Sequence, residues 1–295
     1  LWFCKPKLIK SYSENNQIES SKESLIMIQD ILSLSEYGGK IDLIKSHLKN
    51  GNVYQINFTS KKKLKSTFNN SFDLYNSLQS KVNPKEGFFL HTNKFDILSF
   101  SPESFIKIDD GIIQTLPIKG TQARSIDKTK DLALKKELIN SKKDKAEHLM
   151  IVDLLRNDLG KICKIGSINV QDLYKIESFP TVHHMVTKIS GQIKDDVSET
   201  EIIQAMFPGG SITGAPKESA MSIIDELEDE NRHIYTGSAG YICNNGDMSF
   251  NICIRTLLQI NNIYEYGVGG GIVWDSNTHD EWNEAHQKSK ILGLL

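Results

Sequence analysis

A run of alternating residues near the C-terminal end limits the possible folds most strongly. Residues 233–273 have the sequence HIYTGSAGYICNNGDMSFNICIRTLLQINNIYEYGVGGGIV, in which β-branched and aromatic segments are separated by turn residues. The pairs Asn245-Gly246 and Asn261-Asn262 are typical of hairpin turns. The run therefore predicts consecutive antiparallel strands. A second hairpin is predicted around residues 109–111, and helical patterns separate the two regions, which favours an α+β fold with antiparallel sheets.

The rest of the chain divides into a linker, helices and further strands. Residues 11–24 are polar without periodicity and are predicted to be a loop. Helices are predicted at 25–34, 39–49 and 71–80, from Ser141 through 158, and from Thr278 onward. Strands are predicted at 52–64, in two parts of 88–108, at 112–121 and at 178–193. Lys119 thus lies near the far end of the return strand of the 109–111 hairpin.

Composition argues against several classes of function. The net charge is −2 and 24% of the residues are charged, which argues against a nucleic-acid or anionic-membrane role. No run approaches the ~20 consecutive apolar residues that a membrane span needs. The four cysteines have no C-x-x-C spacing, so zinc and redox motifs are absent. Scattered cysteines of this kind fit reduced core residues in a cytoplasmic protein.

Two pairs of carboxylates share helix faces. Asp144 and Glu147 are three residues apart on one predicted helix, and Glu281 and Glu284 have the same spacing on the last one. Four such groups facing one point would hold a hard divalent cation, and Mg²⁺ usually takes one or two carboxylates plus waters and substrate oxygens. Asp144 and Glu281 also lie at predicted helix starts, where acidic groups cap backbone amides. From spacing alone, a metal site and helix capping both stay open.

Three further features have both a functional and a structural interpretation. Arg255 lies in FNICIRTLL, which predicts a strand buried on at least one side, so its guanidinium must meet a carboxylate of the protein or of a substrate. Glu103 and Lys119 lie on opposite strands of one hairpin, where they form either a salt bridge or an acid and a nucleophile facing one small molecule. The stretches FPGGSITGAPK and GVGGG offer free backbone N–H groups to an anion. The first of them fits neither a P-loop nor a dinucleotide-binding fingerprint.

Taken in order along the chain, these segments resemble those of one family. They are SPE (101–103), PIKGT (117–121), AEHLMIVDLLRND (146–158), FPGGSITGAPK (207–217), GVGGGIV (267–273) and E-W-N-E followed by a lysine (281–288). Over roughly residues 40–295 the chain resembles the chorismate-utilising enzymes. The resemblance implies an anthranilate synthase component I-like fold, a single chorismate-binding domain (40–295) of two antiparallel β-sheets packed together with helices on the outside. Residues 1–39 would form a short N-terminal segment and linker, whereas the family usually has a longer N-terminal region.

Two positions distinguish the branches of this family. Isochorismate and salicylate synthases resemble one another in having a lysine base where this chain has Gln55, and an amide cannot take a proton at neutral pH. Anthranilate synthases typically have P-I-A-G-T where this chain has P-I-K-G-T, as in the aminodeoxychorismate synthases. The resemblance therefore implies aminodeoxychorismate synthase component I, which converts chorismate and ammonia to 4-amino-4-deoxychorismate for folate and para-aminobenzoate biosynthesis. Anthranilate synthase component I is the alternative, and isochorismate synthase is a weaker one.

The resemblance also implies roles for individual residues. Lys119 would attack C2 of chorismate as a free amine, and Glu103 would protonate the departing C4 hydroxyl. Mg²⁺ would be held by Glu147 and Glu284, with Asp144 and Glu281 orienting its waters. The expected substrate-binding residues are Arg255, Tyr235, Gly269, Gly270, Gly271, Thr121, Ser211, His184, Lys288 and Gln55. Ammonia would come from a separate glutamine amidotransferase, and no nucleic-acid or membrane partner is expected.

Overall fold

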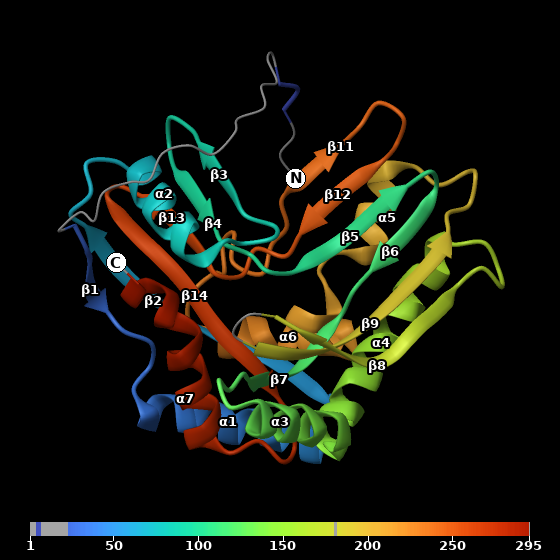
Figure 1. Cartoon of the computed structure of the whole chain (residues 1–295), viewed down its shortest axis with the longest axis horizontal. Helices are drawn as coiled ribbons and strands as arrows, with labels where there is room; N and C mark the ends of the chain where they lie inside the picture. The colour runs from blue at the N-terminus through green and yellow to red at the C-terminus, as the bar shows by residue number, and fades with distance from the viewer. Residues whose placement is uncertain (1–3, 7–22, 180–181, 295) are drawn as a thin grey trace.

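The fold is built from antiparallel strands in two sheets, with helices against their faces (Figure 1). The computed structural model describes residues 4–6, 23–179 and 182–294. Within these residues, the first sheet has the strand order β1 (Leu25–Gln29), β2 (Gln55–Ser66), β14 (Ile263–Ile272), β13 (Thr256–Ile260), β4 (Asp96–Ser99) and β3 (Phe88–His91), and β10 (Gly214–Ala215) pairs with β2. The second sheet has the order β11 (Gly240–Ile242), β12 (Met248–Asn251), β5 (Ser104–Asp109), β6 (Ile112–Thr115), β9 (Val182–Gln192) and β7 (Ile118–Ala123), and β8 (Asn169–Ser178) also pairs with β9. The predicted α+β fold of two antiparallel sheets and outer helices is confirmed.

Helices cover the sheets and supply the buried cores. They are α1 (Leu34–Lys49), α2 (Ser71–Val82), α3 (Lys128–Asn140), α4 (Lys142–Ile162), α5 (Glu199–Met206), α6 (Lys217–Leu227) and α7 (Thr278–Lys288), with short 3-10 turns η1 (Gly210–Ile212) and η2 (Ser289–Leu294). The second sheet packs against α4 and α5, where Ile151 and Met206 meet Ile106 and Ile189. In the first sheet, α2 and η2 cover one cluster, and α1 and α6 pack around β2 in another. Each sheet therefore has its own apolar core.

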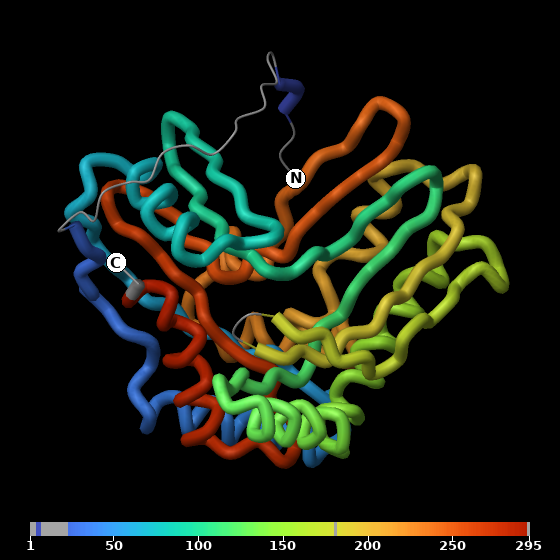
Figure 2. Tube along the Cα trace, viewed as in Figure 1, coloured from blue at the N-terminus to red at the C-terminus, as the bar shows by residue number. Residues whose placement is uncertain are grey.

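Segments far apart in the sequence meet in the first sheet. β2 pairs with β14 from Leu64 opposite Tyr264 to Ile56 opposite Ile272, so an early strand and a late strand form the middle of the sheet. The tube view shows the same closeness for α1 and α7, drawn blue and red beside each other (Figure 2). Trp282 of α7 donates its indole N–H to the carbonyl of Leu32, just before α1. These contacts place α7 beside the central strands, where its charged residues can reach the other sheet.

The N-terminal part differs from the sequence-based expectation. The helix predicted at 25–34 is wrong, because Leu25–Gln29 pairs with β2 as an edge strand. The next helix begins at Leu34 rather than at residue 39, since Ser33 and Glu36 form a reciprocal capping box there. Of the predicted loop 11–24, residues 11–22 lie outside the described part of the chain. The division into 1–39 and 40–295 stays a prediction.

Several predicted strands are interrupted. The return strand predicted at 112–121 splits into β6 and β7, with Pro117 at the break. Residues 88–108 form β3, β4 and the start of β5 rather than two strands, which leaves Glu103 in the connection before β5. The strand predicted across FNICIRTLL is broken between β12 and β13, and Arg255 has φ 50° there. Both β8 and α3 were absent from the sequence-based prediction. The breaks matter because site residues lie on them.

Candidate active site

Lys119 is placed by an irregular end of β7. The pairing register with β9 shifts between Lys119 and Thr121, and Gly120 has φ 71° at that point. A Cβ on residue 120 would lie 2.9 Å from Leu138 Cδ1 of α3 and 3.1 Å from Asp144 of α4. Glycine is therefore required both for the backbone conformation and for the close approach of the two helices. The result is that α4 lies next to Lys119.

The amine of Lys119 lies among charged groups from several elements. Burial lowers the pKa of Lys119, Glu147 of α4 raises it, and Lys288 of α7 lowers it again, so that the pKa ends below the usual value for lysine. Glu103 and Glu284 also act on this amine. An increased fraction of Lys119 is thus uncharged at neutral pH, and the uncharged amine is the nucleophilic form.

The pKa of Glu103 is shifted in the opposite direction to that of Lys119. Burial raises the pKa of Glu103 to about 7. The charge of Lys119, the contact with Ser211 and the charges of Lys288 and Arg255 oppose this rise. The Ser211 hydroxyl lies 3.5 Å from Glu103 Oε1, and the backbone N–H of Ile252 donates to the Glu103 carbonyl at 3.0 Å. Near neutral pH a substantial fraction of this carboxyl still carries its proton, which is the state that a general acid needs.

Carboxylates from α4 and α7 face one another. Burial raises the pKa of Glu147, and the charge of Glu281 on the other helix raises it further. Burial likewise raises the pKa of Glu281, which accepts a hydrogen bond from Ser276 at 2.7 Å. Burial would raise the pKa of Glu284 too, but Lys288 Nζ, 2.7 Å away, leaves it below its usual value. We call Lys119, Glu103, Glu147, Glu281, Glu284 and Lys288 the reactive cluster.

The donor set fits a hard divalent cation. A Cβ on Gly270 would lie 3.5 Å from Glu281 Oε2, 3.6 Å from Glu284 Oε1 and 3.5 Å from Lys288 Nζ, so the two carboxylates of α7 approach one point, which the Lys288 ammonium also approaches. Among the described residues, no three His, Cys, Asp or Glu side chains converge as a preformed metal site. Mg²⁺ commonly takes only one or two protein carboxylates, so this arrangement agrees with its coordination habits. The mutual repulsion of Glu147 and Glu281 is the kind that a cation would relieve.

A glycine strand forms one side of the cluster. We use this name for Gly267 to Gly271 of β14, which run beside β2. A Cβ on Gly269 would come within 2.2 Å of the Phe58 carbonyl oxygen, and one on Gly271 within 2.9 Å of Gln55 Nε2. Gln55 is fully buried, and both polar atoms of its amide lack a hydrogen-bond partner among the described residues. At Gly269 and Gly271 the strand therefore admits close neighbours because these positions carry no side chain.

Lys288 and Tyr235 contact the glycine strand directly. Lys288 Nζ donates to the carbonyl of Gly269 at 2.7 Å while pairing with Glu284. The ring of Tyr235 fills the place of a side chain at Gly267, where a Cβ would lie 2.2 Å from its Cγ. Both residues were predicted to bind substrate, and both lie against the backbone that was predicted to grip a carboxylate.

Arg255 lies near Glu103, but it is not in the buried strand that its sequence context predicts. It is exposed, and it lies on the break between β12 and β13 rather than inside a buried strand. Its charge lowers the pKa of Glu103 and, after the larger effect of burial, that of His184. The expectation of a buried guanidinium is therefore wrong, because the positive φ turns this residue out of the strand. An exposed guanidinium beside Glu103 is free to meet an anionic ligand.

His184 and Thr121 form a pair on the neighbouring strands. Thr121 Oγ1 lies 2.9 Å from His184 Nδ1, and the two residues are opposite each other on β7 and β9. Burial and then Arg255 lower the pKa of His184 to about 4, so its imidazole is neutral at physiological pH. Thr121 lies two residues after Lys119, and His184 is next to Met185, the strand partner of Lys119.

Comparison with known proteins identifies the family of this chain. The model of the family described as chorismate binding enzyme matches residues 5–293. The chain belongs to this family. A sequence relative is the aminodeoxychorismate synthase component 1 of Escherichia coli (strain K12), 41% identical over 90% of this chain. The anthranilate synthase component 1 of Saccharolobus solfataricus is 41% identical over 72% of it.

A solved structure shows the same fold. The anthranilate synthase component I of Streptococcus pneumoniae TIGR4 superposes with a TM-score of 0.82 and 30% identity, covering 92% of this chain and 60% of that one. This chorismate binding enzyme spans 59% of the length of the Escherichia coli relative and 51% of the Saccharolobus one. The family match, over residues 5–293, includes every segment that carries the reactive cluster.

One residue of this chorismate binding enzyme was missed from the sequence. His148 is fully buried next to Glu147, and its Nε2 lies 2.6 Å from Thr187 Oγ1 of β9. Burial and the charge of Lys119 lower the pKa of His148 to about 4. It lies four residues after Asp144, hence on the same helix face, and that spacing was the available signal.

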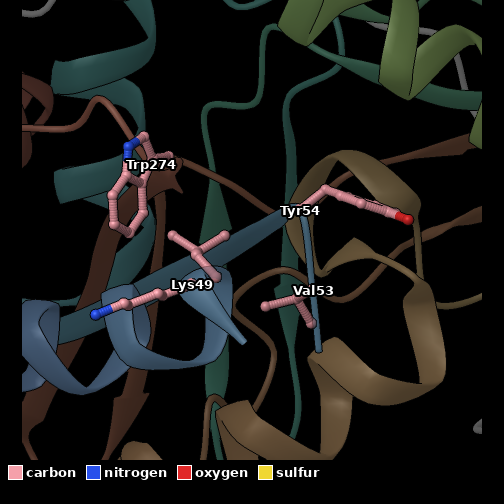
Figure 3. A pocket seen from close by; sticks show the side chains of 5 residues that line it. Lys49, Val53, Tyr54 and Trp274 are labelled. Carbon is pink, nitrogen blue, oxygen red and sulfur yellow. The ribbon is translucent and has the colours of Figure 1, made fainter. Parts of the chain in front are cut away.

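Hollows in the described surface lie beside the cluster rather than on it. One of about 360 Å³ is lined by Leu48, Lys49, Val53, Tyr54 and Trp274 (Figure 3). Another, of about 250 Å³, is bordered by Ile212, Thr213, Glu228, Arg232, Tyr235 and Thr236, together with other residues. Within the described ranges no helix is both long and apolar enough to cross a membrane.

Proposed function

We propose that this chain is the component of an aminodeoxychorismate synthase that converts chorismate and ammonia to 4-amino-4-deoxychorismate, for folate and para-aminobenzoate biosynthesis. The observation that carries the proposal is Lys119, an amine with a lowered pKa that lies beside a carboxyl with a pKa of about 7. The 41% identity with a relative of that name supports it. The free cysteines Cys4, Cys163, Cys243 and Cys253 fit a cytoplasmic location.

The first half-reaction uses Lys119 and Glu103 together. The lone pair of Lys119 Nζ forms a bond to C2 of chorismate, both conjugated ring double bonds shift (C1=C2 to C1=C6 and C5=C6 to C4=C5), and the C4–O bond breaks. Glu103 gives its proton to the leaving oxygen, which departs as water. Lys119 then holds the ring as a secondary amine after losing one proton. Arg255 and the backbone of Gly269 to Gly271 would hold the enolpyruvyl carboxylate during this step.

The second half-reaction reverses the shift with a new nucleophile. Ammonia forms a bond to C4 and loses one proton, both double bonds return to their original positions, and the C2–N bond to Lys119 breaks. The lysine regains one proton and leaves as the free amine, so the atoms sum to chorismate plus ammonia giving the 4-amino product plus water. Ammonia would come from a separate glutamine amidotransferase, which the words "component 1" in the relatives' names support.

We also propose that Mg²⁺ binds between α4 and α7. Glu147 and Glu284 would hold it, and Asp144 and Glu281 would orient its waters. When bound, the cation supplies positive charge to the ring carboxylate of the substrate. Two observations support this assignment: the carboxylates of Glu281 and Glu284 approach one point at Gly270, and the charge of Glu281 raises the pKa of Glu147.

The covalent step is tested with Lys119→Ala in the presence of chorismate, Mg²⁺ and ammonium. We expect formation of the 4-amino product to fall by roughly 10²-fold or more, because the nucleophile is lost. Lys107→Ala, at an exposed lysine on β5 of the same sheet, should keep the wild-type rate. An undiminished rate in Lys119→Ala would exclude the lysine adduct.

Product identity separates the proposal from anthranilate synthase. Chromatography with mass detection should show the 4-amino compound from wild-type enzyme, because Lys119 occupies the position where anthranilate synthases typically have alanine. A 2-amino aromatic product released with pyruvate would instead show that the chain is an anthranilate synthase component.

A further inference from the structure

A guanidinium outside the reactive cluster joins three segments that line it. Arg232 follows α6, and its side chain and that of Glu228 are 15% and 7% exposed. The guanidinium donates to both carboxylate oxygens of Glu228, from Nε at 2.8 Å and from Nη2 at 2.7 Å. This is the forked geometry that arginine offers and lysine cannot reproduce.

The remaining donors of Arg232 reach three other segments. Nη2 donates to the carbonyl of Asn57 on β2 at 2.6 Å, and Nη1 to the carbonyl of Ile212 at 2.8 Å. Nη1 also lies 3.4 Å from Thr236 Oγ1. An arginine has five N–H groups, and this set occupies all of them. Arg232 therefore joins β2, the 207–216 loop and the 233–237 segment through one side chain.

Each of the joined segments carries a residue of the site. Asn57 is paired with Gly271 of the glycine strand. Ile212 follows Ser211, whose hydroxyl lies 3.5 Å from Glu103. Thr236 follows Tyr235, whose ring packs on Gly267.

Glu228 extends these connections. Its Oε1 accepts from the backbone N–H of Thr59 at 2.9 Å and from the Thr59 hydroxyl at 2.8 Å. Thr59 is the strand partner of Gly269. The carboxylate thus reaches the glycine strand at a second point, two residues from the contact through Asn57.

Four buried residues of these segments border the 250 Å³ hollow: Ile212, Thr213, Tyr235 and Thr236. The Arg232 guanidinium gives two of them, Ile212 and Thr236, a polar contact beside this hollow. Arg232 and Glu228 border the same hollow.

We propose that Arg232, with Glu228, is a positioning residue that sets the affinity of the site for its anionic substrate by holding Ser211, Tyr235 and the glycine strand in register. The proposal rests on the proposed function only in taking chorismate as that substrate. Arg232 touches neither substrate nor reacting atoms, so it acts on binding and not on the proton or nucleophile steps.

The test is Arg232→Lys, which keeps the charge and removes the fork. We expect KM for chorismate, and its Kd measured by calorimetry with Mg²⁺, to rise about tenfold, because small displacements of binding groups weaken contacts steeply. We expect kcat at saturation to change less than about threefold. Arg156→Lys makes the same change at an exposed pair with Asp153 and should leave both constants unchanged.

A merely structural role predicts a different pattern. If Arg232→Lys only lowers the folded fraction, kcat per total protein falls while KM and Kd stay at wild-type values, and the proposal is overturned. Glu228→Gln provides a second variant that keeps an acceptor for Thr59 but loses the paired charge. It should raise Kd in the same direction, and a wild-type Kd in both variants would also overturn the proposal.

The two proposals can fail separately. A wild-type enzyme that binds chorismate but forms another product refutes the aminodeoxychorismate synthase assignment and leaves the Kd comparison valid. Correct product formation with an unchanged Kd in Arg232→Lys refutes the positioning role alone. Absence of chorismate binding by wild-type enzyme would overturn both.

Discussion

In the proposed mechanism, Lys119 and Glu103 need protonation states that free lysine and free glutamate do not have at neutral pH. The structure supplies both shifts from the same cause, which is removal of the charged forms from water. Their charges also oppose those shifts, because an ammonium and a carboxylate nearby stabilise each other. The productive state therefore has a neutral amine beside a neutral carboxyl.

We expect a bell-shaped pH dependence of kcat/KM. Above a pH of about 7, Glu103 loses the proton that the leaving hydroxyl needs, so the rate falls on the alkaline side. At lower pH, Lys119 becomes an ammonium and cannot attack, so the rate falls on the acid side. Glu103→Gln should lower kcat by roughly 10²-fold and remove the alkaline limb. If the alkaline fall of kcat/KM persists unchanged in Glu103→Gln, a group other than Glu103 causes it.

Gly120 should be sensitive to the smallest substitution. Gly120→Ala combines φ 71° with a Cβ 2.9 Å from Leu138, and we expect a loss of roughly 2 kcal/mol in the free energy of unfolding measured in urea. Gly111→Ala is a matched control, since it has φ 72° but nothing within 4 Å of the added Cβ. Its cost should be about 1 kcal/mol. Equal costs at the two positions would show that the close approach of α3 and α4 contributes nothing.

At the scale of elements, α4 and α7 each deliver carboxylates to one place from different cores. Their spacing was visible in the sequence, because residues three apart on a helix share a face. Their meeting was not visible, because it depends on β7 and β14 bringing the two helices together. The spacing in the sequence thus predicted which carboxylates share a helix face. Tertiary contacts determined which groups that face lies against.

Removing the cation should abolish activity, and Mg²⁺ should restore it after chelation with EDTA. Glu147→Gln should raise the Mg²⁺ concentration for half-maximal activity by at least about tenfold, because one proposed ligand loses its charge. Asp153→Asn removes a charge from the exposed side of the same helix and should not change it. A similar Mg²⁺ requirement in Glu147→Gln and wild type would contradict the assigned ligand, and direct calorimetric titration with Mg²⁺ checks the result without turnover.

Local signals predicted some boundaries correctly and failed at others. The start of α4 was predictable because the Ser141 hydroxyl accepts from the Asp144 N–H within one turn. The break after β12 was not, because its backbone bonds to distant segments: Ile252 N–H donates to the Glu103 carbonyl and Cys253 N–H to that of Gly237. The strand β1 was mistaken for a helix for a similar reason, since its partner lies on β2. The identities of the site residues came from ordered motifs, whereas the partners of Lys288 and Arg232 needed the fold.

At the scale of the whole molecule, a buried ion pair joins the halves that carry the two sheets. Asp158 of α4 belongs to the core under the second sheet, and its side chain is 1% exposed. Lys217 begins α6, which packs around β2 of the first sheet, and its Nζ lies 2.6 Å from Asp158 Oδ2. The contact ties the end of the 207–216 loop to the helix that carries Glu147.

Breaking this pair should destabilise the protein as a whole. Lys217→Met leaves Asp158 buried with one exposed lysine partner, and we expect the free energy of unfolding to fall by roughly 3 kcal/mol. The double variant Asp158→Asn with Lys217→Met should recover part of this loss, since no buried charge is left unpaired. Lys161→Met removes the exposed partner of the same carboxylate and should cost less than about 1 kcal/mol. Equal losses for Lys217→Met and Lys161→Met in urea titrations would show that burial of the pair is immaterial.

The pairing of β2 with β14 also has a consequence for how the protein is made. On the ribosome, β2 emerges some two hundred residues before the strand that completes its hydrogen bonds, and contacts of such long sequence separation form slowly. Throughout that interval the nascent chain displays an unfinished sheet, together with apolar side chains that later become core. This sheet should therefore be completed only after β14 has been synthesised, late in translation or after it.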